Sequence, residues 1–320
     1  MKKILSLVAL MLVLVMALAS CGGTGATKLT MGTGGSQGTY YAFGGVLSQY
    51  ISNNTDASCT SVPSGGSKGN LQGIDSGDYQ LGFVQTDVMA YAWSGTNTFA
   101  EEGKIDSFRV VGGLYAEAVQ LITTNPDIKT VADLKGKSVS IGDPGSGVYF
   151  NAIDVLAAAD LTEADINAQY LDFGASADGL QDGKIDAAFI VAGAPTTAVV
   201  QLMTAKEAHL VPIDGEFAEK IKASCPYYTD YIIPAGTYNG QTEDVKTITV
   251  KATLIVSADV DEDTVYNLTK AIFDNAEAIK GEHAKGAELS VENATSGITA
   301  PFHKGAARYF AEKGVTVVTE

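Results

Sequence analysis

The sequence predicts an α/β protein of two similarly built lobes with a ligand cleft between them. Short apolar strands alternate with segments of helical periodicity along most of the 320 residues. A strand, a glycine-rich loop and a helix follow one another in residues 29–50, and the same order recurs from residue 138 to 158. Two extended stretches, Phe108–Thr124 and Val245–Ser257, are too long for the sheet of one lobe. We therefore predict that both cross between the lobes and bend as hinges.

The N-terminus is typical of a secretory signal peptide. Lys2 and Lys3 precede an apolar run over residues 4–19, which is too short and wrongly flanked for a stable membrane span. The run ends in LASC at residues 18–21, which resembles the bacterial lipoprotein cleavage box. We therefore predict a lipoprotein signal peptide over residues 1–20, lipidation of Cys21 and a flexible tether over residues 21–27. The alternative is an ordinary signal peptide with a chance cysteine.

The net charge and the cysteine content limit which partners and which disulfide we expect for this protein. The net charge is −16, and residues 1–20 contain two lysines and no acidic residue, so the mature protein would carry −18. No basic patch is visible, so we do not expect nucleic acid as a partner. Cys59 and Cys225 could form a disulfide in an exported protein. A bridge between lobes would lock the hinge, so two separate buried thiols are the preferred prediction.

The first glycine-rich loop is a candidate ligand cradle. Four glycines between Gly32 and Gly38 let a bound molecule approach the main chain closely. Ser36 or Thr39 could cap the following helix, and its free N–H groups favour a carboxylate or a phosphate. A tight turn without a ligand is the alternative for this loop alone.

A second copy of the pattern strengthens the ligand interpretation. Residues 35–41 (GSQGTYY) align with residues 145–150 (GSGVYF) after one deletion. Residues 71–84 and 180–191 are also alike, since each contains a helix end, a glycine turn and an apolar strand. Two such lobes would present their loops to one shared ligand at the carboxyl ends of their strands.

The remaining elements follow from periodicity. We predict a first lobe of residues 28–115 with 255–320 and a second lobe of residues 116–254, each with a parallel-type sheet. The predicted strands are Lys28–Gly32, Cys59–Pro63, Leu81–Val84, Arg109–Thr123, Ser138–Ile141, Ala168–Phe173, Ala187–Val191, Leu210–Ile213 and Thr247–Val256. The predicted helices are Tyr41–Ile51, Lys68–Ile74, Val148–Ala158, Thr196–Met203, Glu262–Ile279 (capped by Asp261) and Lys304–Glu312.

Ordered motifs over the whole chain after the tether resemble one protein family. They are MGTGGSQGTYY (31–41), SGGS (64–67), GFVQTD (82–87), DLKGK (133–137), GDPGSG (142–147), DAAFIVAGAP (186–195), IPAGTY (233–238) and HKGA (303–306). The series resembles the TAXI solute receptors of tripartite ATP-independent periplasmic (TRAP) transporters. The resemblance implies a type II periplasmic-binding-protein fold whose lobes close on a small solute. It also implies delivery to integral-membrane TRAP subunits, and a small carboxylate or an amino acid such as glutamate as the solute. In the 142–147 loop, Asp143 stands where the family usually has alanine, which adds a carboxylate near the pocket mouth.

We predict a ligand site built from the loops of both lobes. A carboxylate would bind Ser146 and the amides of Gly145–Gly147, while Gln85 and Asp87 would bind an ammonium or amide group. Tyr115 would form part of the pocket wall. For Asp87, the alternative is that it only caps the helix that follows it. The full predicted set is Gly35, Gln37, Thr39, Tyr40, Ser64, Gly66, Ser67, Gln85, Asp87, Tyr115, Gly145, Ser146, Gly147, Gly193 and Pro195.

Neither a catalytic constellation nor a cofactor or metal motif is predicted. Residues 32–37 lack the third glycine of a dinucleotide loop, and residues 179–185 are one residue short of a Walker loop. His209, His283 and His303 lie in no metal-ligand spacing and beside no nucleophile. The predicted function is therefore an extracytoplasmic solute receptor anchored to the bacterial cell membrane. An exported enzyme or adhesin on the same two-lobe fold is the alternative.

Overall fold

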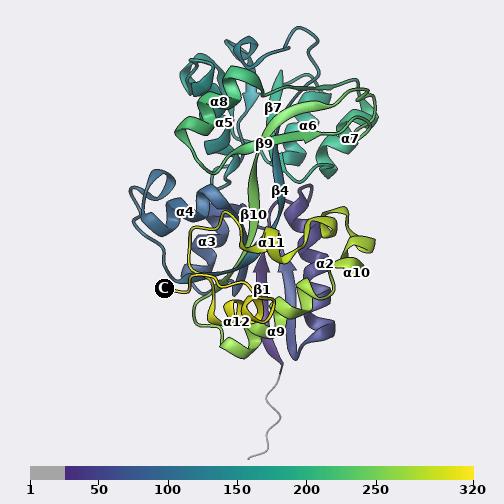
Figure 1. Cartoon of the computed structure of the whole chain (residues 1–320). Helices are drawn as coiled ribbons and strands as arrows, with labels where there is room; N and C mark the ends of the chain where they lie inside the picture. The colour runs from purple at the N-terminus through teal and green to yellow at the C-terminus, as the bar shows by residue number, and fades with distance from the viewer. Residues whose placement is uncertain (1–25) are drawn as a thin grey trace, which may run out of the picture.

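A computed structural model describes residues 26–320 as two α/β lobes joined by two long strands (Figure 1). The predicted signal peptide, Cys21 and most of the tether lie outside the described residues. The crossing strands are β4 (Phe108–Thr123) and β10 (Val245–Ser257). The first lobe contains β1 (Thr27–Gly32), α2 (Thr39–Asn54), β2 (Ala57–Val62), α3 (Ser67–Asp75), β3 (Leu81–Gln85), α4 (Thr86–Ser94), α9 (Glu262–Phe273), α10 (Ala276–Glu282), α11 (Val291–Thr295) and α12 (Lys304–Glu312). The second lobe contains β5 (Ser138–Ser140), α5 (Val148–Ala158), β6 (Asn167–Gln169), α6 (Phe173–Gln181), β7 (Ala187–Ala192), α7 (Thr197–Ala205), β8 (His209–Val211), α8 (Gly215–Ser224) and β9 (Thr229–Ile233).

One continuous sheet runs through both lobes, in the order β2-β1-β3-β10-β4-β7-β5-β6. The prediction of a separate parallel-type sheet in each lobe is wrong in this respect. β10 pairs antiparallel with β3 through residues 252–256, with β9 through 245–249 and with β4 along most of its length. β4 in turn pairs antiparallel with β7 through residues 118–123. The two long strands therefore belong to both lobes, and their pairing shows register shifts at Ala252/Thr253 and Leu254/Ile255.

The hydrophobic cores follow the division into lobes. One core joins Phe43 and Phe83 to Phe273 and Phe310, so the C-terminal helices complete the first lobe. In the second lobe, Phe189 of β7 packs into a core on one face of the sheet, and its neighbour Ile190 packs into another on the opposite face. Side chains alternate along a strand, so a strand covered by helices on both faces is apolar throughout.

Two predicted boundaries are wrong for identifiable local reasons. The predicted helix Glu262–Ile279 is split into α9 and α10, because the side chain of Asn275 donates to the carbonyl of Ala271 and interrupts the helix. The predicted strand to Phe173 ends at Gln169, because Asp172 accepts a hydrogen bond from the Ala175 amide and caps α6.

The internal repeat is visible in the structure. Gly77 follows α3 and Gly183 follows α6, and both have left-handed backbone angles, with φ of 83° and 70°. Each turn leads into a buried strand, β3 or β7. Glycine adopts this conformation without the steric penalty of a Cβ atom, which explains its recurrence at both turns.

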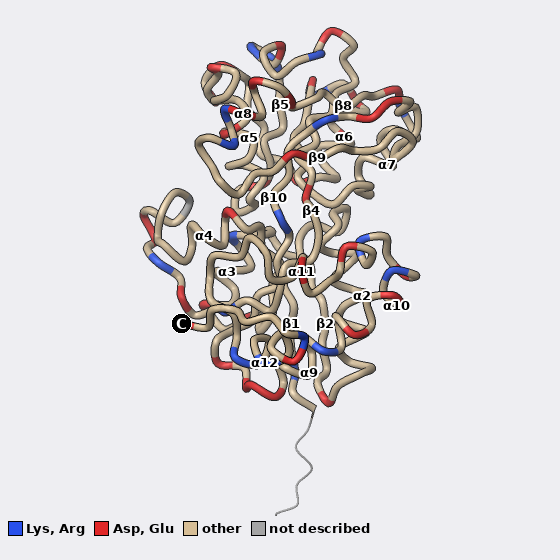
Figure 2. Tube along the Cα trace, in the orientation of Figure 1, with Lys and Arg blue, Asp and Glu red and all other residues tan. Residues whose placement is uncertain are grey.

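Neither cysteine in the described part of the chain is cross-linked. Cys59 lies in the core of the first lobe and Cys225 in that of the second, and both are buried free thiols, as preferred from the sequence. Among residues 26–320, no helix has the length and apolarity required to cross a bilayer. Lys and Arg are interspersed with Asp and Glu over both lobes (Figure 2).

Candidate functional site

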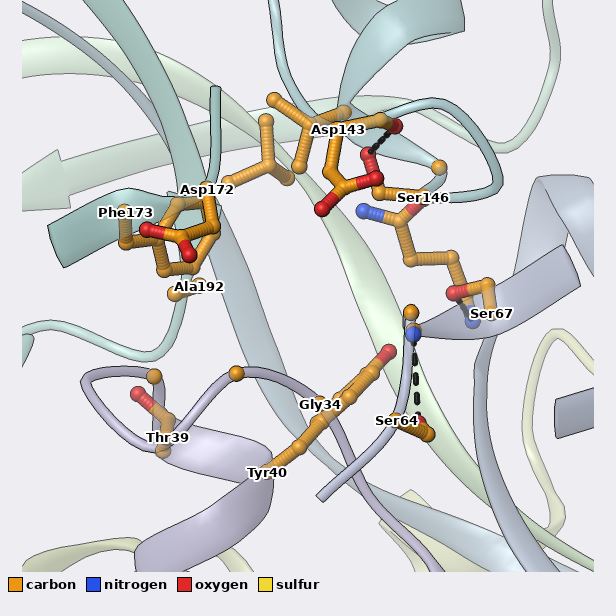
Figure 3. Close-up of a pocket in the computed structure, with 18 of the residues that line it drawn as sticks. Gly34, Thr39, Tyr40, Ser64, Ser67, Asp143, Ser146, Asp172, Phe173 and Ala192 are labelled. Carbon is orange, nitrogen blue, oxygen red and sulfur yellow. Dashed lines mark hydrogen bonds between the residues drawn. The ribbon is translucent and has the colours of Figure 1, made fainter. Parts of the chain in front are cut away.

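A pocket that is partly open to solvent lies between the lobes. Clefts between two lobes are a common place for small-molecule sites. Figure 3 shows Thr39, Tyr40, Ser64 and Ser67 of the first lobe on one side, and Asp143, Ser146 and Asp172 of the second lobe opposite them. The lining residues are Gly34, Gly35, Gly38, Thr39, Tyr40, Ser64, Gly65, Gly66, Ser67, Gln85, Glu117, Asp143, Ser146, Gly147, Val148, Leu171, Asp172, Phe173, Val191 and Ala192.

The lining comes from the carboxyl ends of strands and the helices that follow them. The loop after β1 leads into α2, the loop after β2 into α3, and the loop after β5 into α5. The end of β7 closes the second lobe's side, and β4 contributes Glu117 where it crosses between the lobes. In α/β sheets these strand ends are the usual place for ligands.

Nine of the predicted site residues line this pocket, while six lie outside its wall. The nine are Gly35, Thr39, Tyr40, Ser64, Gly66, Ser67, Gln85, Ser146 and Gly147. The six are Gln37, Asp87, Tyr115, Gly145, Gly193 and Pro195.

Three of those six join the lobes through their carbonyl oxygens. Gly145 accepts hydrogen bonds from the amides of Lys68 and Gly69, at 3.1 and 3.3 Å. Gly193 accepts from the Thr39 hydroxyl at 2.8 Å, and Gln37 accepts from the Ala198 amide at 3.2 Å. These hydrogen bonds connect the two lobes directly.

Asp87 is part of another interlobe contact. It is fully buried, and Asn151 of α5 donates through Nδ2 to its Oδ2 at 3.0 Å. The same Nδ2 donates to the Tyr228 hydroxyl at 2.6 Å, and Tyr228 donates to Asp154 at 2.9 Å. Burial raises the pKa of Asp87 to about 7, against the hydrogen bonds from Val88 and Asn151. The prediction that Asp87 contacts the solute is not supported by this position.

Tyr115 also lies behind the pocket wall. Its ring is fully buried and packs edge-on against Phe43, with ring centroids 5.5 Å apart. Lys285 lies over the same ring, 5.6 Å from its centroid, and pairs with Glu288 at 2.7 Å. Pro195 follows a cis peptide at the end of β7 and does not reach the pocket.

Glu117 is one of the eleven lining residues that the predicted site did not include. Only 2 % of it is exposed, and the Tyr40 hydroxyl donates to its Oε2 at 2.6 Å. Burial is the main cause that raises the pKa of Glu117 to about 8, while the Tyr40 hydrogen bond opposes the shift. A signal was available, because Glu117 is the only acidic residue in the otherwise largely apolar segment 108–123.

Asp143 and Asp172 add two further carboxylates to the second lobe's side (Figure 3). Burial, and secondarily the negative charge of Asp172, raise the pKa of Asp143. No Lys, Arg or His is present in the lining among the residues that the structure describes. The described residues also contain no group of three or more His, Cys, Asp or Glu side chains suited to a metal ion.

The hydroxyl groups of the lining are largely engaged with the protein. Ser64 donates to Asn70 Oδ1 at 2.7 Å, and Ser146 donates to the Asp143 carbonyl at 2.8 Å. Neither Ser36 nor Thr39 caps α2, whose N-cap residue is Gly38 without a side-chain hydrogen bond. The predicted cap is therefore wrong, because the Thr39 hydroxyl donates to Gly193 in the other lobe.

The model of the NMT1-like family matches residues 31–314 of the chain. Several solved structures share the fold. PhnD1 from Prochlorococcus marinus in complex with methylphosphonate superposes with a TM-score of 0.57 at 11 % identity, covering 90 % of this chain and 98 % of that one. The alkanesulfonate-binding protein SsuA from Xanthomonas axonopodis pv. citri, bound to MOPS, gives 0.52 at 18 % identity, covering 90 % and 85 %. An ancestral arginine-binding protein bound to arginine gives 0.50 at 14 % identity, covering 82 % and 98 %. The chain therefore has the type II periplasmic-binding-protein fold.

Proposed function

The chain belongs to the NMT1-like family, and on that premise we propose that it is a solute receptor that encloses a small molecule between its lobes. The observation that carries the proposal is a single pocket lined by both lobes. Thr39, Tyr40 and Ser67 come from one side, and Asp143, Ser146 and Asp172 from the other. A solute there would contact both lobes at once, so its binding would favour the closed form.

Closure is supported by the number and kind of contacts between lobes. The amides at the start of α3 donate to Gly145, and Thr39 donates to Gly193. Gln85 of the first lobe donates through Nε2 to Asn151 Oδ1 of the second at 3.1 Å. These contacts are hydrogen bonds between polar groups, which water could replace if the lobes separated.

The solute class is proposed from the TAXI resemblance as a small carboxylate or an amino acid. The first turns of α2 and α5 border the pocket and leave amide groups without partners within their helices. The similar solved structures hold methylphosphonate, MOPS and arginine. The fold alone therefore does not select the charge of the solute.

The location and transport partner follow the same resemblance. We propose that Cys21 carries a lipid anchor on the outer face of the bacterial cell membrane. The receptor would pass its solute to the integral-membrane subunits of a TRAP transporter. Co-purification of those subunits with the solute-loaded receptor tests the partner, and uptake that persists without them would contradict it.

A binding assay with product analysis tests the receptor function itself. The mature protein is screened by thermal shift against small carboxylic acids, amino acids and amines, and each bound compound is then recovered and identified by mass. A receptor returns the compound unchanged. A compound that is converted would instead support the alternative of an exported enzyme, and the absence of any shift would contradict the proposal.

A further inference from the structure

Resting on this receptor function, we propose that the solute is recognised by a protonated amine, which Glu117, Asp143 and Asp172 hold in the interlobe pocket. The inference selects amine-bearing solutes, zwitterions included, over simple mono- and dicarboxylates. It replaces Gln85 and Asp87, the predicted ammonium partners, by a different set of residues.

The charge of the wall is the first observation. Three carboxylates line the pocket, and no basic side chain of the described lining accompanies them. The nearby cation Lys285 pairs with Glu288 at 2.7 Å and is not part of the wall. A dicarboxylate would add like charge to this wall, whereas an ammonium group would neutralise part of it.

Hydrogen-bonding capacity is a second and independent observation. A hydroxyl group has one proton to donate and two lone pairs to accept with. Four of the five hydroxyl groups in the lining direct their protons to protein acceptors. Thr39 donates to Gly193, Tyr40 to Glu117, Ser64 to Asn70 and Ser146 to Asp143. Their oxygen atoms can therefore only accept further bonds, and the wall as a whole suits a solute rich in N–H donors.

Gln85 also lines the pocket, but its side-chain Oε1 is not open to the solute. This atom is buried against Gly147 of the other lobe, and its Nε2 donates to Asn151. The carboxylates and the hydroxyl oxygens of the wall are therefore the acceptors that an amine can reach.

Glu117 is placed to dominate the interaction with the amine. Among the described residues, only Tyr40 donates to its carboxylate, which leaves acceptor capacity for a further donor. Because its surroundings are dry, its negative charge is poorly stabilised in the empty pocket, and the raised pKa of Glu117 reflects this. Lys285 favours the ionised form of Glu117 but is paired with Glu288, so an ammonium group beside Glu117 would add a countercharge of its own.

The carboxylate of an amino acid can still be accommodated. The first amides of α2 and α5 border the pocket, and they are donors without partners inside their helices. An amino acid would thus bind by both ends, while a diamine would bind by the acidic wall alone.

A matched ligand series tests the inference by calorimetry at pH 8. Glutarate, 5-aminopentanoate and cadaverine have the same five-carbon chain, and the twenty amino acids are compared with their 2-hydroxy counterparts. We expect binding only among compounds with a free amine. Binding of an amine-free acid as tightly as its amine counterpart would overturn the inference and leave the receptor function standing. If neither the amine-bearing nor the amine-free compounds bind, both the inference and the receptor function are contradicted.

Substitution of the carboxylates in the pocket wall is the second test of the inference. Glu117→Gln keeps the side-chain size and an acceptor for Tyr40, so we expect a loss of affinity for the amine of about tenfold or more with retained folding. Glu216→Gln is the matched control, because it removes the same charge on α8 outside the pocket. Unchanged affinity in folded Glu117→Gln protein would overturn the inference. If that variant does not fold, Asp143→Asn replaces it. No hydrogen bond of the described protein uses the Asp143 side chain, so this change should leave the fold intact. An affinity equal to that of the wild type would again overturn the inference.

Discussion

Gly147 of the second lobe lies directly against Gln85 of the first. A Cβ atom built on Gly147 would be 1.6 Å from Gln85 Oε1, and 2.9 Å from the Val88 side chain. Glycine therefore permits this close contact between the lobes, because a side chain here would displace the Gln85 amide or hold the lobes apart.

The first prediction is that Gly147→Val abolishes solute binding through failed closure. The three atoms nearest to the new Cβ all belong to the opposite lobe, so each lobe should fold as before, with a melting temperature within about 3 °C of the wild type. Calorimetry with any identified solute should show a loss of affinity of about a hundredfold or more. Gly45→Val is the control, because a Cβ at Gly45 meets nothing within 4 Å. Wild-type affinity in folded Gly147→Val protein would place the solute outside this pocket.

The second prediction concerns stability and pH. The pKa of Asp87 is raised by burial from 3.8 to about 7, so the folded protein keeps a proton that the unfolded chain releases. The stability that depends on this proton is complete below about pH 4 and is lost as the pH rises to about 7. Each carboxyl group of this kind contributes at most about 1.4 kcal/mol per pH unit.

Asp87→Asn isolates this contribution. Its amide oxygen can still accept from Asn151, and the other titrating groups are common to both proteins. Urea unfolding of the solute-free proteins between pH 4 and 8 should show a shallower decline for the variant. Parallel curves would show that Asp87 is not protonated in the folded state.

The third prediction is that amine binding releases a proton below pH 8. The pKa of Glu117 is raised to about 8 in the solute-free pocket, and an ammonium group favours its ionised form. Affinity for an amine should therefore increase from pH 6 to pH 8, by at most about tenfold per unit. Calorimetry at pH 7 in buffers of different ionisation enthalpy counts the released proton. Glu117→Gln should remove that proton, and a buffer-independent enthalpy in the wild type would contradict the prediction.

The fourth prediction concerns motion. If β4 and β10 act as hinges, saturating solute should reduce the radius of gyration, because only these two long strands and the loops beside them would need to bend. Small-angle X-ray scattering with and without solute measures the change, with Gly147→Val as the variant that should stay open. Equal radii for the wild type in both states would argue against closure.

The fifth prediction concerns the anchor. Cys21→Ala should move the protein from the membrane fraction to the soluble extracytoplasmic fraction, because the lipid attachment would be lost. Immunoblots of fractions washed with salt measure this, with Cys59→Ala as the control cysteine. Retention of the Cys21→Ala protein on washed membranes would exclude a lipid anchor at this position.

The sequence alone determined those features of the fold that depend on local patterns of residues. The helices Val148–Ala158 and Lys304–Glu312 have the predicted bounds, because apolar periodicity and neighbouring loop signals define a helix without reference to the rest of the chain. Cys59 and Cys225 were assigned to different lobes as free thiols, which the structure confirms.

The sequence indicated Asp143 near the pocket mouth, but only the tertiary structure decided where Asp87 and Glu117 lie relative to the pocket. Asp87 ends the GFVQTD motif and was predicted to bind solute, yet packing turns it toward Asn151 in the other lobe. Glu117 lies in the middle of a long apolar strand, and the crossing of that strand between lobes brings it to the pocket wall. A side chain's environment is set by the segments packed around it, many of them distant in sequence, and no local pattern records which of those segments leave room for a solute.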